Sequence, residues 1–271
     1  ALLDAEMGAD TTPRPLLAFD VFSLTLLELD PRWVRRVAEA TTASWSGLAP
    51  VRRALGSVAF ARADAAAGGA TRAREAHRRT GVRKQAGGAA GIRRARPPLR
   101  IALSSFNFRD HATGSNVRSF VAQSNASRLA VRCHSHGPDD GSPQRRTLER
   151  LCGGGWIDTW ALGEVDRAER VVADGIEIFV DLVAHSHGAS HGVAARRPAP
   201  LVVAAQGYPG TSGARYVDYA LVDAVVVPPE RRFSGGWSEK LVYMPASYQV
   251  SFLFIYRYIS RESGSHLTRS P

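Results

Sequence analysis

The sequence predicts an α/β protein with a Rossmann-like, mostly parallel sheet and helices on both faces. From residue 99 onward, strand-like apolar runs alternate with helical stretches, the order that builds such a sheet. Runs such as LVVAA and DAVVV are apolar throughout or nearly so, as strands buried on both faces are. A hydrophobic content of 44% over 271 residues is enough for a core of this kind.

Residues 1–67 are expected to form an N-terminal helical segment. Asp30 followed by Pro31 marks a helix start, with an N-cap and a proline at the first helical position. Apolar residues then recur at helical spacing and form one face of this helix: Trp33, Val34, Val37 and Ala38.

Residues 68–98 read as a basic Ala/Gly/Arg-rich linker that is disordered. From residue 69 to 98 there are nine lysines and arginines against one acid, Glu75, within a chain of net charge +10. The composition fits either a linker or a polyanion-binding arm for RNA or an acidic membrane surface. Because no aromatic residue interleaves the arginines, we favour the linker and do not expect a nucleic-acid partner.

Residues 99–250 carry the predicted sheet, and residues 251–271 form a tail unrelated to it. The strands are expected at 99–106, 128–136, 156–162, 176–184, 201–206, 220–227 and 240–245. The helices are expected at 117–125, 143–152 and 164–175.

Targeting and cysteine signals predict a protein of a reducing compartment. No stretch approaches the roughly 20 apolar residues of a membrane span, and the N-terminus has no secretory pattern. The chain lacks an initiator Met, which suggests a fragment of a longer product. Cys133 and Cys152 have no CxxC partner, so we expect two free thiols and neither a disulfide framework nor structural zinc.

Three unusual loops follow predicted strands. We call FRDHATGSN (108–116) the first loop, DLVAHSHGASHG (181–192) the second loop and GYPGTSG (207–213) the third loop. Ligands of open parallel sheets bind at the carboxyl ends of the strands. The three loops are therefore expected to converge on one binding edge.

The third loop predicts a tight turn. Pro209 and Gly210 fit the centre of a type II turn, with Gly210 at positive φ. Gly207 and Gly213 would let the backbone approach a ligand, and Thr211 adds a hydroxyl donor. A purely structural turn fits the same residues, which match neither a dinucleotide fingerprint nor a P-loop.

The first and second loops carry candidate acid–base groups. His111, flanked by Asp110 and Thr113, could take up a proton near neutral pH, or it is a solvated loop histidine. Asp181 could orient a base or a donor amide, or cap the next turn. The second loop also holds a group of histidines without an acidic or cysteine ligand to complete a metal site, so no metal is expected: His185, His187 and His191.

Longer stretches resemble a known family. RPAPLVVAAQGYPGTSGARYVDYALVD followed by WSEKLVYMP is similar to the catalytic region of the O-linked N-acetylglucosamine transferases and the SPINDLY-type O-fucosyltransferases. LRIALSSFNFRDHAT resembles the family's opening strand with its histidine loop, and DGIEIFVDL its central strand. The resemblance runs from about residue 98 to 250.

The resemblance implies the N-terminal lobe of a GT-B enzyme. Such an enzyme transfers a sugar from a nucleotide-sugar donor, UDP-GlcNAc or another, to Ser/Thr hydroxyls of proteins, with inversion, no cofactor and a cytoplasmic and/or nuclear location. It implies catalytic roles for His111 and Asp181. It implies substrate contacts for several further residues: Thr113, Pro200, Gly207, Tyr208, Pro209, Gly210 and Thr211.

Two departures from the family pattern keep an alternative open. AHSHGAS stands where the family has a loop like NGYTKGAR, and the resemblance ends before the nucleotide-binding half. Either the chain is part of an enzyme, or it is a non-catalytic binding or scaffolding module derived from this lobe. The sugar is either N-acetylglucosamine or fucose.

Overall fold

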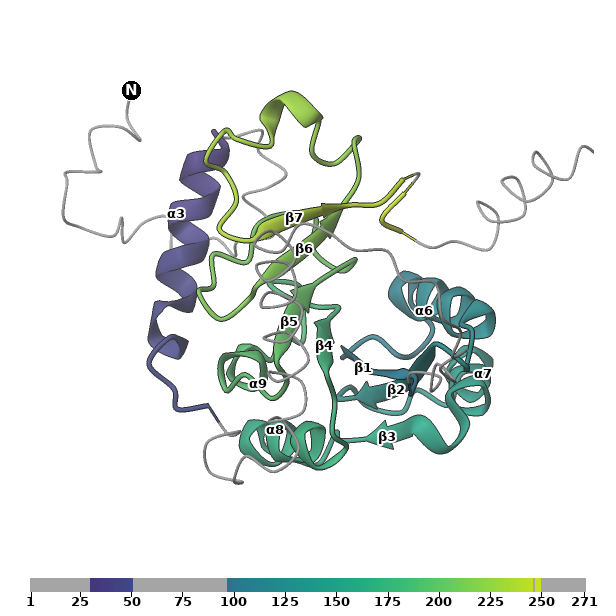
Figure 1. The fold of residues 1–271 in the computed structure, drawn as a ribbon. Helices are drawn as coiled ribbons and strands as arrows, with labels where there is room; N and C mark the ends of the chain where they lie inside the picture. The colour runs from purple at the N-terminus through teal and green to yellow at the C-terminus, as the bar shows by residue number, and fades with distance from the viewer. Residues whose placement is uncertain (1–29, 51–96, 246, 250–271) are drawn as a thin grey trace, which may run out of the picture.

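The structure, a computed structural model, describes residues 30–50, 97–245 and 247–249 (Figure 1). Its centre is a seven-stranded, all-parallel sheet of order β3-β2-β1-β4-β5-β6-β7, which confirms the predicted fold class. The predicted basic linker, apart from its last two residues, and the predicted C-terminal tail lie outside the described residues. No helix of the described part is long and apolar enough to cross a bilayer.

The strands and helices alternate along the chain from residue 99. The strands are β1 (Leu99–Ser105), β2 (Leu129–Ser135), β3 (Trp156–Asp158), β4 (Ile178–Asp181), β5 (Leu201–Ala204), β6 (Tyr219–Val222) and β7 (Lys240–Tyr243). The α-helices are α3 (Pro31–Thr42), α6 (Ala112–Gln123), α7 (Pro143–Cys152), α8 (Glu164–Ala173) and α9 (His191–Ala195). Short 3₁₀ turns are η2 (Ala43–Trp45), η3 (Gly153–Gly155) and η4 (Pro229–Arg231).

The sheet has a core on each face, as alternating strand side chains require. Figure 1 shows α6 and α7 on one side of the sheet and α8 and α9 on the other. Ile101 and Leu103 of β1 pack with residues of α6 and α7, whereas Ala102 between them packs with residues of α8 and α9. The predicted double coverage is confirmed.

Several strands are shorter than predicted, β3 most clearly, since it ends at Asp158 and not at residue 162, and two further boundaries have a visible cause. The run DAVVV is not a strand, because β6 ends at Val222 and Asp223 then accepts hydrogen bonds from the N–H groups of Val225 and Val226. Val225 is 85% exposed. Helix α6 begins at Ala112 and not at residue 117, since His111 caps it.

Helix α3 packs against the main domain. Asp30 caps it as predicted, accepting from the N–H of Arg32 at 2.8 Å. Arg35 donates to the carbonyls of Gly235 and Trp237, in the connection before β7, at 3.1 Å each. Helix α3 therefore supports the β6–β7 end of the sheet.

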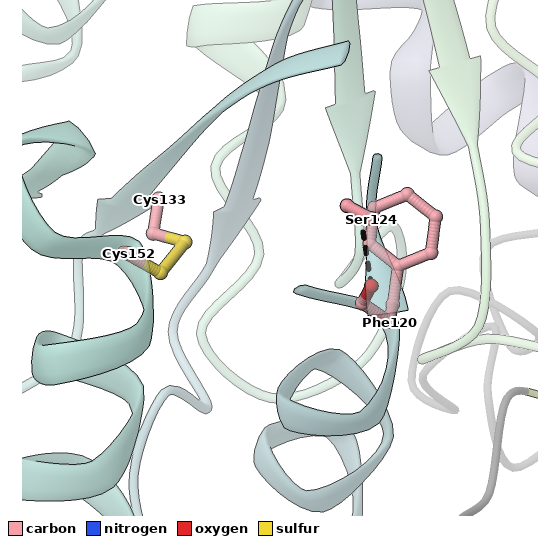
Figure 2. Close-up of a disulfide and its surroundings, with 4 residues drawn as sticks. All are labelled: Phe120, Ser124, Cys133 and Cys152. Carbon is pink, nitrogen blue, oxygen red and sulfur yellow. Dashed lines mark hydrogen bonds between the residues drawn. A yellow bond between two sulfur atoms is a disulfide. The ribbon is translucent and has the colours of Figure 1, made fainter. Parts of the chain in front are cut away.

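The prediction of two free thiols is wrong, because Cys133 and Cys152 form a disulfide (Figure 2). Their Cα atoms are 6.2 Å apart, joining β2 to the last residue of α7. Both residues belong to the core under α6 and α7. Spacing along the chain did not reveal the pair, since it is the β2–α7 crossover that brings the two cysteines together.

Candidate functional site

The sheet order places the three loops at neighbouring strand ends. The chain runs outward from β1 to β2 and β3, then returns to the other side of β1 with β4. The carboxyl ends of β1 and β4 therefore form a topological switch point, where open α/β sheets bind ligands. The first and second loops follow these two strands, and the third loop follows β5 beside β4.

The second and third loops are in direct contact. Ser186 donates from Oγ to the Gly207 carbonyl, and His185 Nε2 lies 2.8 Å from the Ser212 carbonyl oxygen. The ring of His185 also meets that of Tyr208, with centroids 5.2 Å apart. Two separate strand ends are thus fixed to each other by polar contacts.

The hydroxyls of the third loop are used inside the protein. Glu239, just before β7, is 7% exposed and accepts from Thr211 Oγ1 at 2.7 Å and from Ser212 N–H at 2.6 Å. Ser212 Oγ donates to the same carboxylate. The Thr211 hydroxyl thus donates to a carboxylate of the protein itself, and its contact with a substrate stays a prediction.

The turn in the third loop is not type II as predicted. Gly210 is not among the glycines with positive φ, whereas Gly213 has φ +66°. A Cβ on Gly213 would lie 2.3 Å from the backbone of α3, and one on Gly207 2.1 Å from the Leu182 carbonyl oxygen. The close approaches made by these two glycines are to the protein's own backbone, and Pro209 is the exposed residue of the turn.

His111 is the N-cap of α6. Its Nδ1 accepts a hydrogen bond from the N–H of Thr113 at 3.1 Å, while the Gln144 side chain donates to its carbonyl at 2.8 Å. Partial burial and the charge of Arg109 lower the pKa of His111. The ring is therefore neutral at pH 7, with its proton on Nε2 because Nδ1 is an acceptor.

Asp181 ends β4 and caps the turn that follows it. Its Oδ1 accepts from the N–H groups of Val183 at 2.9 Å and Ala184 at 3.2 Å. Burial raises the pKa of Asp181, opposed by these hydrogen bonds. Ala184 has φ +46°, a left-handed backbone that the carboxylate cap stabilises.

Pro200 does not lie with the third loop. Pro200 precedes β5 and lies at its amino end, whereas the third loop follows its carboxyl end. The four extended residues of β5 separate these two ends by about 13 Å. At that opposite edge Arg197 contacts the Pro200 carbonyl at 3.2 Å and the Asp218 carboxylate at 2.9 Å. The predicted contact of Pro200 with the sugar-nucleotide donor stays a prediction, and the structure places Pro200 at the end of β5 opposite to the third loop.

Comparisons with known proteins agree with this architecture. The sequence profile of glycosyl transferase family 41 matches residues 89–259. The chain belongs to glycosyl transferase family 41. It is similar to a UDP-N-acetylglucosamine–peptide N-acetylglucosaminyltransferase of Caenorhabditis elegans, 34% identical over 56% of this chain and 13% of that protein. It is also similar to the probable enzyme SEC of Arabidopsis thaliana, 30% identical over 56% of this chain and 15% of that protein.

A solved structure shares the fold. The Thermobaculum terrenum O-GlcNAc transferase mutant K341M superposes with a TM-score of 0.53 at 30% identity, over 56% of this chain and 29% of that chain. This family 41 chain thus spans less than a sixth of the length of the two curated relatives and under a third of the solved one.

Sequence reasoning missed an aromatic cluster at the switch point of this family 41 lobe. Phe106, just past β1, contacts the rings of Trp160 at 6.0 Å and His187 at 5.2 Å. The guanidinium of Arg109 lies 5.1 Å from the Phe106 centroid. Trp160 is 51% exposed, so the cluster reaches the surface beside His187. No periodic signal marks it, because its rings come from separate strand ends.

Three histidines around the second loop have pKa values lowered to about 4, chiefly by burial: His136, His185 and His191. The rings of His185 and His191 lie 4.8 Å apart, so protonation of one disfavours protonation of the other. Within residues 30–50, 97–245 and 247–249, no three His, Cys, Asp or Glu side chains gather as a metal site.

Proposed function

We propose that the chain is the N-terminal lobe of the catalytic region of a protein O-glycosyltransferase. It would act with a facing nucleotide-binding lobe in transferring a sugar from UDP-GlcNAc or another nucleotide-sugar to Ser/Thr hydroxyls of proteins, with inversion. The observation that carries the proposal is the third loop, GYPGTSG, fixed by Glu239 at the carboxyl edge of the sheet. The names of the relatives support the reaction class.

In this proposal His111 donates a hydrogen bond from Nε2–H to the reacting groups of the substrates. An attacking hydroxyl loses a proton and the departing diphosphate gains charge, and a fixed donor stabilises such developing charge. With Nδ1 occupied by the Thr113 N–H, the neutral ring has no lone pair on Nε2. A base role for His111, as expected from the sequence, would require the other tautomer and the loss of that capping bond.

Paired variants of His111 test this role. His111→Asn keeps an oxygen acceptor for the Thr113 N–H, since asparagine is a good N-cap, but it has no group at the Nε2 position. His111→Ala removes both and costs about 1 kcal/mol of stability as a lost cap. We expect equal losses of transfer in the two variants and a loss of stability only in the alanine variant.

The assay measures transfer of GlcNAc from UDP-GlcNAc to a Ser-containing peptide by a protein carrying the rest of the family's catalytic region. Isothermal titration with UDP and UDP-GlcNAc accompanies it. Full transfer by His111→Asn would remove Nε2 from the mechanism. Donor binding without any transfer favours the alternative, a non-catalytic binding module.

A further inference from the structure

His136 connects three strand ends at the switch point. It directly follows β2 and is buried, with 3% of the residue exposed. Nδ1 lies 3.2 Å from the hydroxyl oxygen of Ser104 on β1, and Nε2 lies 3.2 Å from the carbonyl oxygen of Gly188 in the second loop. One side chain thus joins β2, β1 and the loop after β4.

The two contacts define one tautomer. A carbonyl oxygen only accepts, so Nε2 must carry the proton that it donates to Gly188. Nδ1 is then bare and accepts from the Ser104 hydroxyl. Burial, with Arg167 and His134 nearby, lowers the pKa of His136 to about 4, so this neutral form is the one present at pH 7.

Gly188 in the second loop also packs closely against the ring of Phe106. Gly188 has φ +82°, and a Cβ there would lie 2.1 Å from Phe106 Cγ. The ring of Phe106 in turn meets those of His136 at 6.3 Å and His187 at 5.2 Å. The position of the Gly188 carbonyl therefore determines where the neighbouring His187 stands against Phe106.

We propose that His136 is a positioning residue for the site: its neutral Nε2–H tautomer fixes the second loop to β1 and so sets the Phe106–His187 pair at the switch point. The inference deepens the proposed function, on which its catalytic consequence rests. His136 itself need not touch substrate. Its effect reaches the switch point through Gly188 and Phe106.

Nuclear magnetic resonance of the ¹⁵N-histidine-labelled chain provides the first test. We expect His136 to be neutral at pH 7 with its proton on Nε2. A proton on Nδ1, or an imidazolium ring at pH 7, would overturn the inference. This measurement uses the unsubstituted chain and therefore stands whether or not any variant folds.

Substitutions provide the second test. His136→Leu keeps the apolar volume but has no donor, whereas the side-chain amide of His136→Gln can reach the Gly188 carbonyl. We expect nuclear Overhauser contacts between the Phe106 and His187 rings to disappear in the leucine variant and to return in the glutamine variant. The matched control is His134→Gln, at a similarly buried histidine of β2 whose Nε2 lies 3.4 Å from the Asp174 carboxylate at the end of α8. Ring contacts retained in His136→Leu would contradict the inference.

The catalytic consequence is measured in the transfer assay. A displacement of about 1 Å at a site can cost about 100-fold in rate. We expect a loss of that order in kcat/KM for His136→Leu and recovery in His136→Gln. Absence of transfer by every form, including the unsubstituted protein, would contradict the proposed function while the resonance measurements still decide the role of His136.

Discussion

Reducing the Cys133–Cys152 disulfide should destabilise the lobe by about 3 kcal/mol. The bond closes a loop of sequence separation 19. Constraining such a loop removes about 11 cal/mol/K of entropy from the unfolded chain, which is about 3 kcal/mol at 25 °C. The freed thiols stay in the core as small apolar groups, so little packing is lost with the bond.

Urea unfolding with and without dithiothreitol measures this difference. For a domain of this size 3 kcal/mol corresponds to a fall in Tm of about 6–12 °C. The double variant Cys133→Ala/Cys152→Ala is the control, because the reductant should not change its stability. A difference below about 1 kcal/mol, or free thiols found by mass spectrometry without reductant, would refute the reasoning.

The disulfide also bears on the compartment. A cytoplasmic or nuclear location remains a proposal, and one argument for it, a pair of free thiols, no longer holds. The cytosol keeps most thiols reduced. Alkylation of thiols in intact cells, followed by mass spectrometry, tells which state Cys133 has, and a fully oxidised pair would contradict the proposed location.

Three further perturbations have defined outcomes in urea unfolding. Glu239→Gln replaces the charged acceptor of the third loop and should cost about 2 kcal/mol, whereas an unchanged midpoint would contradict its structural role. Gly207→Ala places a Cβ 2.1 Å from a carbonyl oxygen of the second loop and should lower the free energy of unfolding by about 1–3 kcal/mol. The control Gly154→Ala should not show this steric loss, because a Cβ at Gly154 would meet no atom within 4 Å. Between pH 6.5 and 4 the histidines of the unfolded chain become protonated, whereas the buried rings of His136, His185 and His191 stay neutral in the folded chain. The free energy of unfolding is therefore complete above about pH 6.5 and falls as the pH drops toward 4. The loss is on the order of 3 kcal/mol for each ring, and a flat pH profile would contradict the lowered pKa values.

Local signals in the sequence predicted the sheet and its helices well. The Asp30–Pro31 helix start and the alternation of apolar runs depend on neighbouring residues, and both are confirmed. The disulfide, the Glu239 carboxylate and the aromatic cluster around Phe106 depend on residues that only the fold brings together. Gly210 shows a different limit, because Pro-Gly is compatible with type II geometry but long-range contacts decide the backbone.

The hydroxyl side chains of Thr211 and Ser212 in the third loop form hydrogen bonds within the protein. Thr211 and Ser212 donate to Glu239, and Gly213 makes room for α3. If the proposed function holds, this loop would therefore meet a sugar-nucleotide with its backbone and the exposed Pro209, beside a second loop held in place through Gly188. The side chains of GYPGTSG are therefore used mainly for packing within the lobe. In the proposed function the chemistry comes from groups outside this loop, and the proposed contribution of this chain is His111 Nε2–H.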